Sequence, residues 1–286
     1  MSDQLTRSQG TQGAQGTQGA QGRVSAAYAT AGAERRAALV GYLPAGFPTV
    51  EGSIAGLRAM VDGGCDVIEI GLPYSDPVMD GPTIQAAAQQ ALERGVRTTD
   101  VLRVVEAVAD TGVATLVMTY WNPIERYGVA RFAADLAAAG GSGMITPDLT
   151  PDEAGPWLEA SEEHGLDRVF LVAPSSTDAR LRYTADHCRG FIYATAVMGV
   201  TGARAATSEL AAPLVERTRA VTDLPVGVGL GVSDGRQAAA VAAYADGVIV
   251  GSAFVRQVLD AEGDLDRACR DLRALSEDLA AGVRHR

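Results

Sequence analysis

The chain has 286 residues, of which 47% are hydrophobic and 21% charged, a balance typical of a globular protein with a substantial core. Its formal net charge of −11 argues against nucleic acids and anionic membranes as partners. All 24 basic residues are arginine, which excludes Schiff-base aldolase chemistry and a lysine-anchored pyridoxal phosphate on this chain.

Cysteine and histidine are too sparse for the common metal sites. The three cysteines show no Cys-x-x-Cys pair, and one of the three histidines lies in the C-terminal tail. The chain also shows no secretion signal and no apolar run of the roughly 18 residues that a membrane span requires. We therefore expect a cytoplasmic protein without a metal, in which carboxylates and tyrosines carry any acid–base chemistry.

The first elements in chain order are a tail and then a regular domain. Residues 11–22 read TQGAQG twice, and such small and polar residues cannot bury enough apolar surface to offset the entropy of ordering. The sequence therefore predicts a disordered Gln/Gly-rich tail over residues 1–23 and one catalytic domain over residues 24–286.

From residue 38 onward, short apolar runs alternate with longer amphipathic segments. Most runs are unbroken, as in parallel strands that are covered on both faces. Eight strands are predicted: Ala38–Tyr42, Asp66–Ile70, Thr115–Thr119, Gly143–Thr146, Arg168–Val172, Gly190–Ala194, Pro225–Val228 and Gly247–Val250. Helices with one apolar face are predicted at Val101–Asp110, Val129–Ala139, Pro151–His164, Asp178–Cys188, Glu209–Val221, Asp234–Tyr244 and Asp264–Leu279.

This alternation predicts an α/β fold, namely a single (β/α)8 TIM barrel, which usually takes about 250 residues. The competing fold is a doubly wound open sheet, which more often has fewer strands and a GxGxxG motif after the first one. That motif is absent here. Active sites of (β/α)8 barrels lie at the C-terminal ends of the strands, so the candidate residues are sought there.

Two carboxylates stand out at the end of the second predicted strand. Glu69 lies inside an apolar run, where a charged group is costly unless it is paired or used. Asp80 follows eleven residues later, in a long proline-rich loop that can fold back over the barrel mouth. A single strand and loop that supply two carboxylates suggest divided acid–base roles. A Glu69 satisfied by an arginine or by backbone amides is the structural alternative.

Glycine-rich turns on the opposite side of the barrel predict a phosphate site. Gly231 follows the seventh strand, Gly251 and Ser252 follow the eighth, and Gly202 lies after the sixth. Glycine permits close backbone approach, and helix N-termini present free N–H groups to an anion. Four further side chains end strands at the same mouth: Tyr193, Tyr42, Met118 and Tyr120. Each could line a substrate pocket or simply pack in the core.

Several of these motifs resemble those of the tryptophan synthase alpha chain family. Residues 68–85, IEIGLPYSDPVMDGPTIQ, resemble the family signature, as do Tyr120–Pro123, Gly199–Gly202 and the turn Gly229–Ser233. The similarity runs from about residue 38 to residue 279. It implies reversible retro-aldol cleavage of indole-3-glycerol phosphate to indole and glyceraldehyde 3-phosphate, without a metal or a Schiff base.

The resemblance also implies roles for individual residues. Glu69 matches the catalytic glutamate that moves protons between the glycerol hydroxyl and indole C3. Asp80 matches the aspartate that hydrogen-bonds the indole N–H, and Tyr193 a tyrosine beside the substrate. The phosphate-binding positions match Gly202, Gly231, Gly251 and Ser252. Tyr42 and Met118 match apolar contacts to the indole ring.

The resemblance further implies a partner. Members usually form an α2β2 heterotetramer with a beta chain, which holds the pyridoxal phosphate and receives the indole through a tunnel. The loops around Pro73–Pro82 and Val197–Ala206 would be lids at that interface. Many members carry an aspartate where this chain has Phe47, which bears on coupling to the partner. Two other hypotheses stay open: a free-standing indole-3-glycerol phosphate lyase, and a catalytically silent regulatory subunit of a beta chain.

Overall fold

The computed structural model of the chain describes residues 22–195 and 204–284. Eight parallel strands pair in sequential order and close into a barrel, which confirms the predicted (β/α)8 fold. All eight predicted strands are present with small shifts in their ends. Their bounds are β1 Ala38–Pro44, β2 Val67–Gly71, β3 Ala114–Met118, β4 Gly143–Thr146, β5 Asp167–Val172, β6 Ile192–Thr195, β7 Val226–Gly229 and β8 Gly247–Val250.

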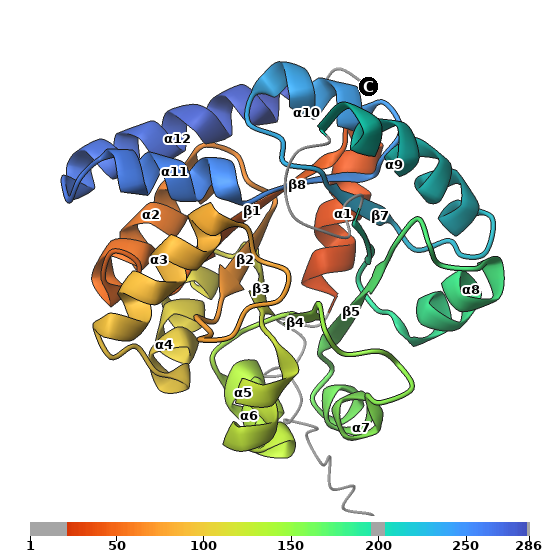
Figure 1. The fold of residues 1–286 in the computed structure, drawn as a ribbon, viewed down its shortest axis with the longest axis horizontal. Helices are drawn as coiled ribbons and strands as arrows, with labels where there is room; N and C mark the ends of the chain where they lie inside the picture. The colour runs from red at the N-terminus through yellow and green to blue at the C-terminus, as the bar shows by residue number, and fades with distance from the viewer. Residues whose placement is uncertain (1–21, 196–203, 285–286) are drawn as a thin grey trace, which may run out of the picture.

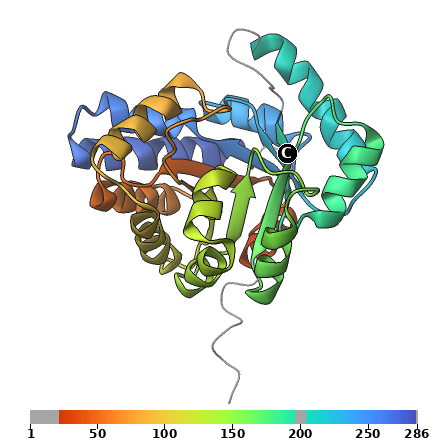
Figure 2. The ribbon, with the colours of Figure 1, turned by 60° about the horizontal axis from the view of Figure 1, so that its bottom comes forward.

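Helices surround the strands on the outside (Figures 1 and 2). The seven helices named from the sequence are all present: α4 Thr98–Ala109, α6 Val129–Ala138, α7 Gly155–Glu163, α8 Asp178–His187, α9 Arg204–Arg219, α10 Gly235–Ala242 and α12 Leu265–Gly282. The structure adds α1 Arg23–Ala33, α2 Val50–Asp62, α3 Pro82–Glu93, α5 Trp121–Tyr127 and α11 Ser252–Asp260. None of the described helices is long and apolar enough to cross a bilayer.

Both faces of the barrel wall are apolar because both faces are covered. Residues that point inward, such as Val40, Val67 and Leu116, form one buried cluster inside the barrel. Residues that point outward, such as Leu39, Ile68 and Val117, pack with the helices in a second and larger cluster. This double coverage explains why the strands appear as unbroken apolar runs in the sequence.

The helix α1 closes the N-terminal end of the barrel, which we call the floor, and lies inside the ring of helices in Figure 1. Its buried residues Val24, Tyr28 and Ala31 follow the spacing of one helical stripe and belong to the interior cluster. Arg23, which the sequence assigned to the tail, is the first residue of α1. Residues 1–21 of the predicted tail lie outside the described residues.

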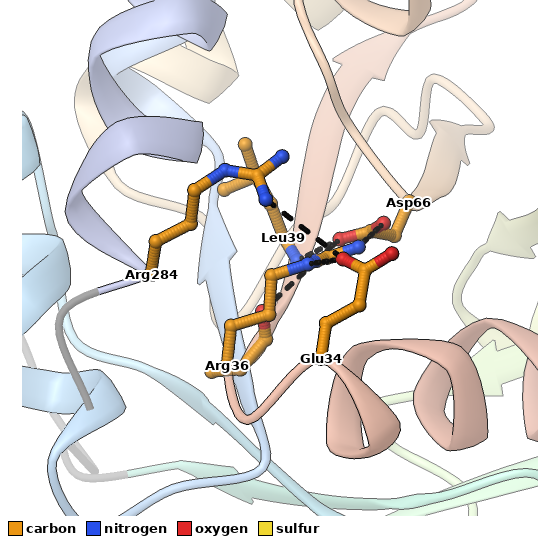
Figure 3. A network of polar contacts seen from close by, with 6 residues as sticks. Glu34, Arg36, Leu39, Asp66 and Arg284 are labelled. Carbon is orange, nitrogen blue, oxygen red and sulfur yellow. Dashed lines mark hydrogen bonds and ion pairs between the residues drawn. The ribbon is translucent and has the colours of Figure 1, made fainter.

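A network of ion pairs and hydrogen bonds stabilises the floor of the barrel (Figure 3). Arg36 donates from Nη1 and Nη2 to the two carboxylate oxygens of Asp66, at 2.6 and 2.8 Å, and from Nε to Glu34. Asp66 also accepts the backbone N–H of Leu39 at 2.8 Å. Arg284, at the end of α12, approaches Glu34 at 3.8 Å. The network joins the turn after α1 to the starts of β1 and β2, and leaves no oxygen of Asp66 without a donor.

Candidate active site

Glu69 is the central polar residue of the C-terminal half of the barrel, which we call the mouth. It lies in β2 opposite Tyr42 of β1 and Leu116 of β3, and it is only 1% exposed. Neither of its carboxylate oxygens has a hydrogen-bond partner among the described residues. Burial without a partner disfavours the charged form and raises the pKa of Glu69 to about 8. The alternative of a Glu69 satisfied by an arginine or by backbone amides is therefore wrong.

Two tyrosines beside Glu69 are seated on glycines of the neighbouring strands. The Tyr42 hydroxyl lies against Gly71 of β2, and the Tyr193 hydroxyl lies against Gly229 of β7, at the points where a Cβ would stand. Burial raises the pKa of both phenols, and the carboxylates of Glu69 and Asp80 raise it further. Tyr42 and Tyr193 therefore remain neutral hydrogen-bond donors near the carboxyl groups of Glu69 and Asp80.

Asp80 reaches the same region from the loop between β2 and α3. Burial raises its pKa, and a side-chain hydrogen bond from Tyr120 opposes that rise. The Tyr120 hydroxyl also accepts the backbone N–H of Met79 at 3.0 Å, so one side chain holds two consecutive loop residues. At the C-terminal end of the same loop, Gln85 donates a hydrogen bond from Nε2 to the backbone carbonyl of Asp80 at 2.8 Å. The structure therefore places Asp80 within reach of Tyr120, whose hydroxyl orients the carboxyl, while the catalytic role of Asp80 stays a prediction.

A second aromatic contact joins the loop to the end of β3. The rings of Tyr74 and Tyr120 lie 5.1 Å apart, and Asn122 donates from Nδ2 to the Tyr74 hydroxyl at 3.0 Å. The sequence analysis noted Tyr120 as a strand-end side chain that could line a pocket, and Asn122 only within a motif that resembles a family. A tyrosine and an asparagine directly after a barrel strand were the signal that could have assigned these residues to the loop.

A cavity of about 220 Å³ opens beside the mouth, between the ends of β4, β5 and β6. Its wall combines apolar side chains with several hydroxyl groups and the guanidinium of Arg180, and the loop residue Met79 borders it. Met118, at the end of β3, is partly buried and packs against both hydrophobic clusters. The cavity thus has a mixed polar and apolar lining, and Met79 is its link to the loop that carries Asp80.

The opposite side of the mouth carries the N-terminus of α11. Gly251 precedes this helix, Ser252 is its first residue, and no side chain caps it. The first N–H groups of a helix have no acceptor within it, so they face an incoming anion. Gly231, in the neighbouring turn, adopts a φ of +67°, and no atom would obstruct a Cβ there. The turn can thus present its backbone to an anion at close range.

The N-terminus of α10 does not share this property. Asp234 accepts the backbone N–H of Gln237 at 2.8 Å, and Asp278 of α12 accepts that of Gly235 at 2.6 Å. Two carboxylates occupy the donors that an anion would use and repel it. The sequence analysis treated the helices after β7 and β8 alike, whereas the structure leaves only the one after β8 uncapped.

Two other predicted positions need separate comment. Gly202 and most of the loop Val197–Ala206 lie outside the described residues. Phe47, which replaces the aspartate of many family members, is 2% exposed and belongs to the outer core cluster. This side chain therefore stabilises the β1–α2 connection by packing.

The described residues contain no cluster of side chains that could bind a metal ion. Within residues 22–195 and 204–284, no three histidine, cysteine, aspartate or glutamate side chains converge as metal ligands do. The three cysteines are free thiols, and two of them, Cys65 and Cys188, are buried. Burial raises the pKa of both thiols to about 12, which makes them poor nucleophiles. The expectation of a metal-free protein stays a prediction.

The fold and the site together define a (β/α)8 barrel with a buried, unpartnered carboxyl and an uncapped helix N-terminus at one mouth. Within this class the chain belongs to the tryptophan synthase alpha chain family, whose model matches residues 28–284. It is 65% identical to the tryptophan synthase alpha chain of Salinispora arenicola, over 91% of this chain and 97% of the relative. It is 64% identical to that of Thermobifida fusca, over 90% and 96%.

Solved structures agree with this assignment. A structure of tryptophan synthase from Mycobacterium tuberculosis superposes with a TM-score of 0.85 at 58% identity, covering 92% of this chain and 98% of that one. The tryptophan synthase alpha subunit of Legionella pneumophila superposes with a TM-score of 0.83 at 31% identity, covering 91% and 98%. The barrel is therefore retained while about two thirds of the residues differ.

Proposed function

We propose that this chain is the alpha subunit of a tryptophan synthase. It cleaves indole-3-glycerol phosphate into indole and glyceraldehyde 3-phosphate and passes the indole to a beta chain. The observation that carries the proposal is Glu69, a buried carboxyl without a partner whose pKa is raised to about 8. Such a group is mostly protonated at neutral pH and keeps a minor ionised fraction, so it can both give and take a proton.

Glu69 acts first as the acid and then as the base. In its neutral form it donates a proton to C3 of the indole ring, which turns the ring into a good leaving group. The resulting carboxylate then takes the proton of the glycerol hydroxyl next to the scissile carbon–carbon bond. As that bond breaks, its electron pair returns to the ring and the hydroxyl oxygen becomes the aldehyde carbonyl. Glu69 ends protonated, as it began.

Asp80 stabilises the charge that this sequence creates. Protonation at C3 places positive charge on the indole nitrogen, and a carboxylate that accepts the indole N–H stabilises that charge. The hydrogen bond from Tyr120 fixes the direction of the carboxylate and favours its ionised form. Tyr193 and Tyr42 flank the reacting atoms as neutral donors and exclude water. Met118 and the apolar wall of the mouth contact the ring.

The phosphate end of the substrate binds at the uncapped end of α11. Gly251, Ser252 and Gly231 supply backbone N–H groups, and Gly202 would add another from the loop after β6. Backbone donors and a helix dipole hold a phosphate without a lysine, which this chain lacks. Binding the phosphate far from the reacting bond fixes the orientation of the indole against Glu69.

The partner is a tryptophan synthase beta chain in an α2β2 heterotetramer. Pyridoxal phosphate belongs to that partner, because its anchoring lysine is absent from this chain. The exposed loop residues Val78 and Met79, 78% and 39% accessible, lie next to Asp80 and suit an interface at the mouth. We place the reaction in the cytoplasm, where the three unpaired thiols stay reduced.

Indole release from indole-3-glycerol phosphate tests this proposal directly. The purified chain is assayed with and without a beta chain, and Glu69→Gln serves as the blank. We expect slow release that rises strongly when the beta chain is added. Fast release that does not change with the partner would indicate the free-standing lyase instead. No release under either condition, from a chain that is folded by circular dichroism, would indicate the silent regulatory subunit.

A further inference from the structure

Tyr28 of α1 places its hydroxyl group inside the barrel from the floor side. Its ring, 5% exposed, stacks on Phe191 with centroids 5.3 Å apart. Its hydroxyl lies against Gly227 of β7 and Gly247 of β8, at the points where a Cβ would stand. Two neighbouring strands thus carry no side chain where the phenol enters. The glycines explain how a residue of α1, outside the strands, fills the barrel interior.

The ladder between the strands locates this hydroxyl relative to the active site. Gly227 is paired with Tyr193 of β6 and with Gly247 of β8. Tyr193 lies in the same half of the barrel as Glu69, and each acts electrostatically on the Tyr28 phenol. The Tyr28 hydroxyl therefore lies on the floor side of the Tyr193–Glu69 pair, and the substrate approaches that pair from the mouth.

The hydroxyl of Tyr28 and the carboxylate of Glu69 share an unusual state. Both are buried, and neither has a hydrogen-bond partner among the described residues. Burial raises the pKa of Tyr28 well above its ordinary value, and among the charged groups Glu69 contributes most to that rise. The phenol is consequently neutral throughout the range in which Glu69 titrates, and it retains a proton that it can donate.

The other charged groups around Tyr28 are already compensated. Asp246, before β8, pairs with Arg219 at 2.7 Å, and Asp66 pairs with Arg36. Glu69 has no such cation. Asp167 of β5, next to Gly190 at the floor, also has one buried oxygen without a hydrogen-bond partner among the described residues, but it is not among the groups that raise the pKa of Tyr28.

On the mouth side, Glu69 interacts electrostatically with the phenols of Tyr42 and Tyr193, and the carboxyl of Asp80 acts on the same two phenols. On the floor side, among the described residues, the Tyr28 hydroxyl is a buried donor without a partner, and Glu69 is a buried carboxyl without one.

We propose that Tyr28 is a positioning residue for the proton carrier: its hydroxyl faces the Glu69 carboxylate from the floor and stabilises its ionised form. The proposal rests on the function proposed above for Glu69. No proton leaves Tyr28, since the phenol only orients its O–H dipole toward the charge that appears when Glu69 has protonated the substrate. Loss of the hydroxyl makes ionisation of Glu69 less favourable and leaves the packing of the ring unchanged.

The first test compares Tyr28→Phe with the wild-type chain over pH 6 to 10, using indole release. If neutral Glu69 starts the reaction, kcat/KM falls as pH rises through the pKa of Glu69 near 8. In Tyr28→Phe we expect this fall to move upward by about half to one pH unit, because the variant lacks the O–H dipole that lowers the cost of ionising Glu69. A purely structural role would lower kcat/KM equally at every pH, and an unshifted profile would overturn the proposal.

Tyr244→Phe is the matched control. The Tyr244 hydroxyl is also buried without a partner, but burial is the sole cause of its pKa rise and no carboxylate contributes. We expect its pH profile to equal that of the wild type. An identical upward shift in both variants would show that removal of any buried hydroxyl suffices, which would also overturn the proposal.

A second measurement is independent of catalysis. Because the hydroxyl acts on ionised Glu69, Tyr28→Phe should lose more stability at pH 9 than at pH 5 in urea unfolding. In a Glu69→Gln background this pH dependence should disappear. If the chain releases no indole but the pH-dependent coupling is present, the proposed function fails and the Tyr28–Glu69 interaction stands. An equal loss of stability at both pH values would refute the interaction itself.

Discussion

Asp66 and Glu69 lie three positions apart in the chain, but their carboxyl groups have opposite hydrogen-bonding states. Asp66, at the floor, accepts two hydrogen bonds from Arg36 and one from the backbone of Leu39. Glu69, inside the barrel toward the mouth, accepts none from the described residues. Both carboxyls belong to the same strand region, so the difference arises from what the rest of the barrel brings to each of them.

The comparison separates stability from function within one strand. At the floor, ion pairs and backbone donors satisfy the charges, which ties α1, β1, β2 and α12 together. At the mouth, the Glu69 carboxyl has no hydrogen-bond partner among the described residues, and no side chain caps the N-terminus of α11. The packing of the rest of the barrel compensates for the free energy that these unsatisfied groups cost. An unsatisfied buried group is what a substrate can satisfy. Four predictions test how far the two ends differ.

The largest effect is expected from Glu69→Gln. The amide keeps the shape of the side chain but cannot carry the proton, so turnover should fall by about 10²–10⁴. Indole release under saturating substrate measures this fall, and binding of glycerol phosphate serves as the control for an intact site. Turnover within a few-fold of wild type would show that Glu69 does not carry the proton. The contrast between a functional carboxyl at the mouth and a structural carboxyl at the floor would then not hold.

Asp66→Asn should damage stability rather than the site. Arg36 has a side chain only 9% exposed, and it would keep a buried charge without its main partner. Breaking a pair of this kind costs on the order of 3–5 kcal/mol of unfolding free energy. Urea unfolding gives the value. The matched control is Glu51→Gln, which breaks the exposed Arg103–Glu51 pair and should cost less than about 1 kcal/mol. Equal losses in both variants would contradict the structural role of the floor network.

The same method applied to Glu69→Gln should give the opposite sign. The folded-state pKa of Glu69 is raised to about 8, so the folded protein binds this proton more tightly than the unfolded chain. Stability is therefore lost as pH rises from about 4.5 to 8. Glu69→Gln removes that loss and should raise the free energy of unfolding at pH 9, by on the order of 2–3 kcal/mol, while leaving it nearly unchanged at pH 4. A variant that is less stable than wild type at both pH values would show that Glu69 is a structural residue.

The smallest effect is expected from Tyr120→Phe. This change removes the hydrogen bond that orients Asp80 and the acceptor of the Met79 N–H, but it keeps the contact with the Tyr74 ring. We expect kcat/KM to fall by about 5- to 30-fold, equivalent to 1–2 kcal/mol. Asp80→Asn sets the scale, because orienting a group cannot contribute more than the group itself. A larger loss in Tyr120→Phe than in Asp80→Asn would mean that Tyr120 contacts the substrate on its own account.

Local patterns in the sequence were sufficient for the barrel and for the location of its mouth. Eight unbroken apolar runs alternating with amphipathic segments determine a parallel sheet that is covered on both faces, and eight such units close on themselves. Glu69 could be found because a charge within such a run is conspicuous, and Asp80 because a long proline-rich loop follows it. The helix α1 was within reach as well, since Val24, Tyr28 and Ala31 have the spacing of one helical face.

Only the tertiary structure decided which polar groups have partners. In the sequence, Asp66 and Glu69 are both acidic residues in or beside the same strand, and the helices after β7 and β8 both begin after a glycine-rich turn. What distinguishes the members of each pair is whether a hydrogen-bond partner is present, and those partners come from distant segments of the chain. Arg36 lies 30 residues from Asp66, and Asp278 lies 43 residues from Gly235. Gly227 and Gly247 lie in predicted strands, and only the structure shows that the side chain of Tyr28 occupies the space left by their missing Cβ atoms. Local periodicity fixes the elements because it depends on neighbours in the chain, whereas hydrogen-bond satisfaction and burial depend on contacts that exist only after the barrel has closed.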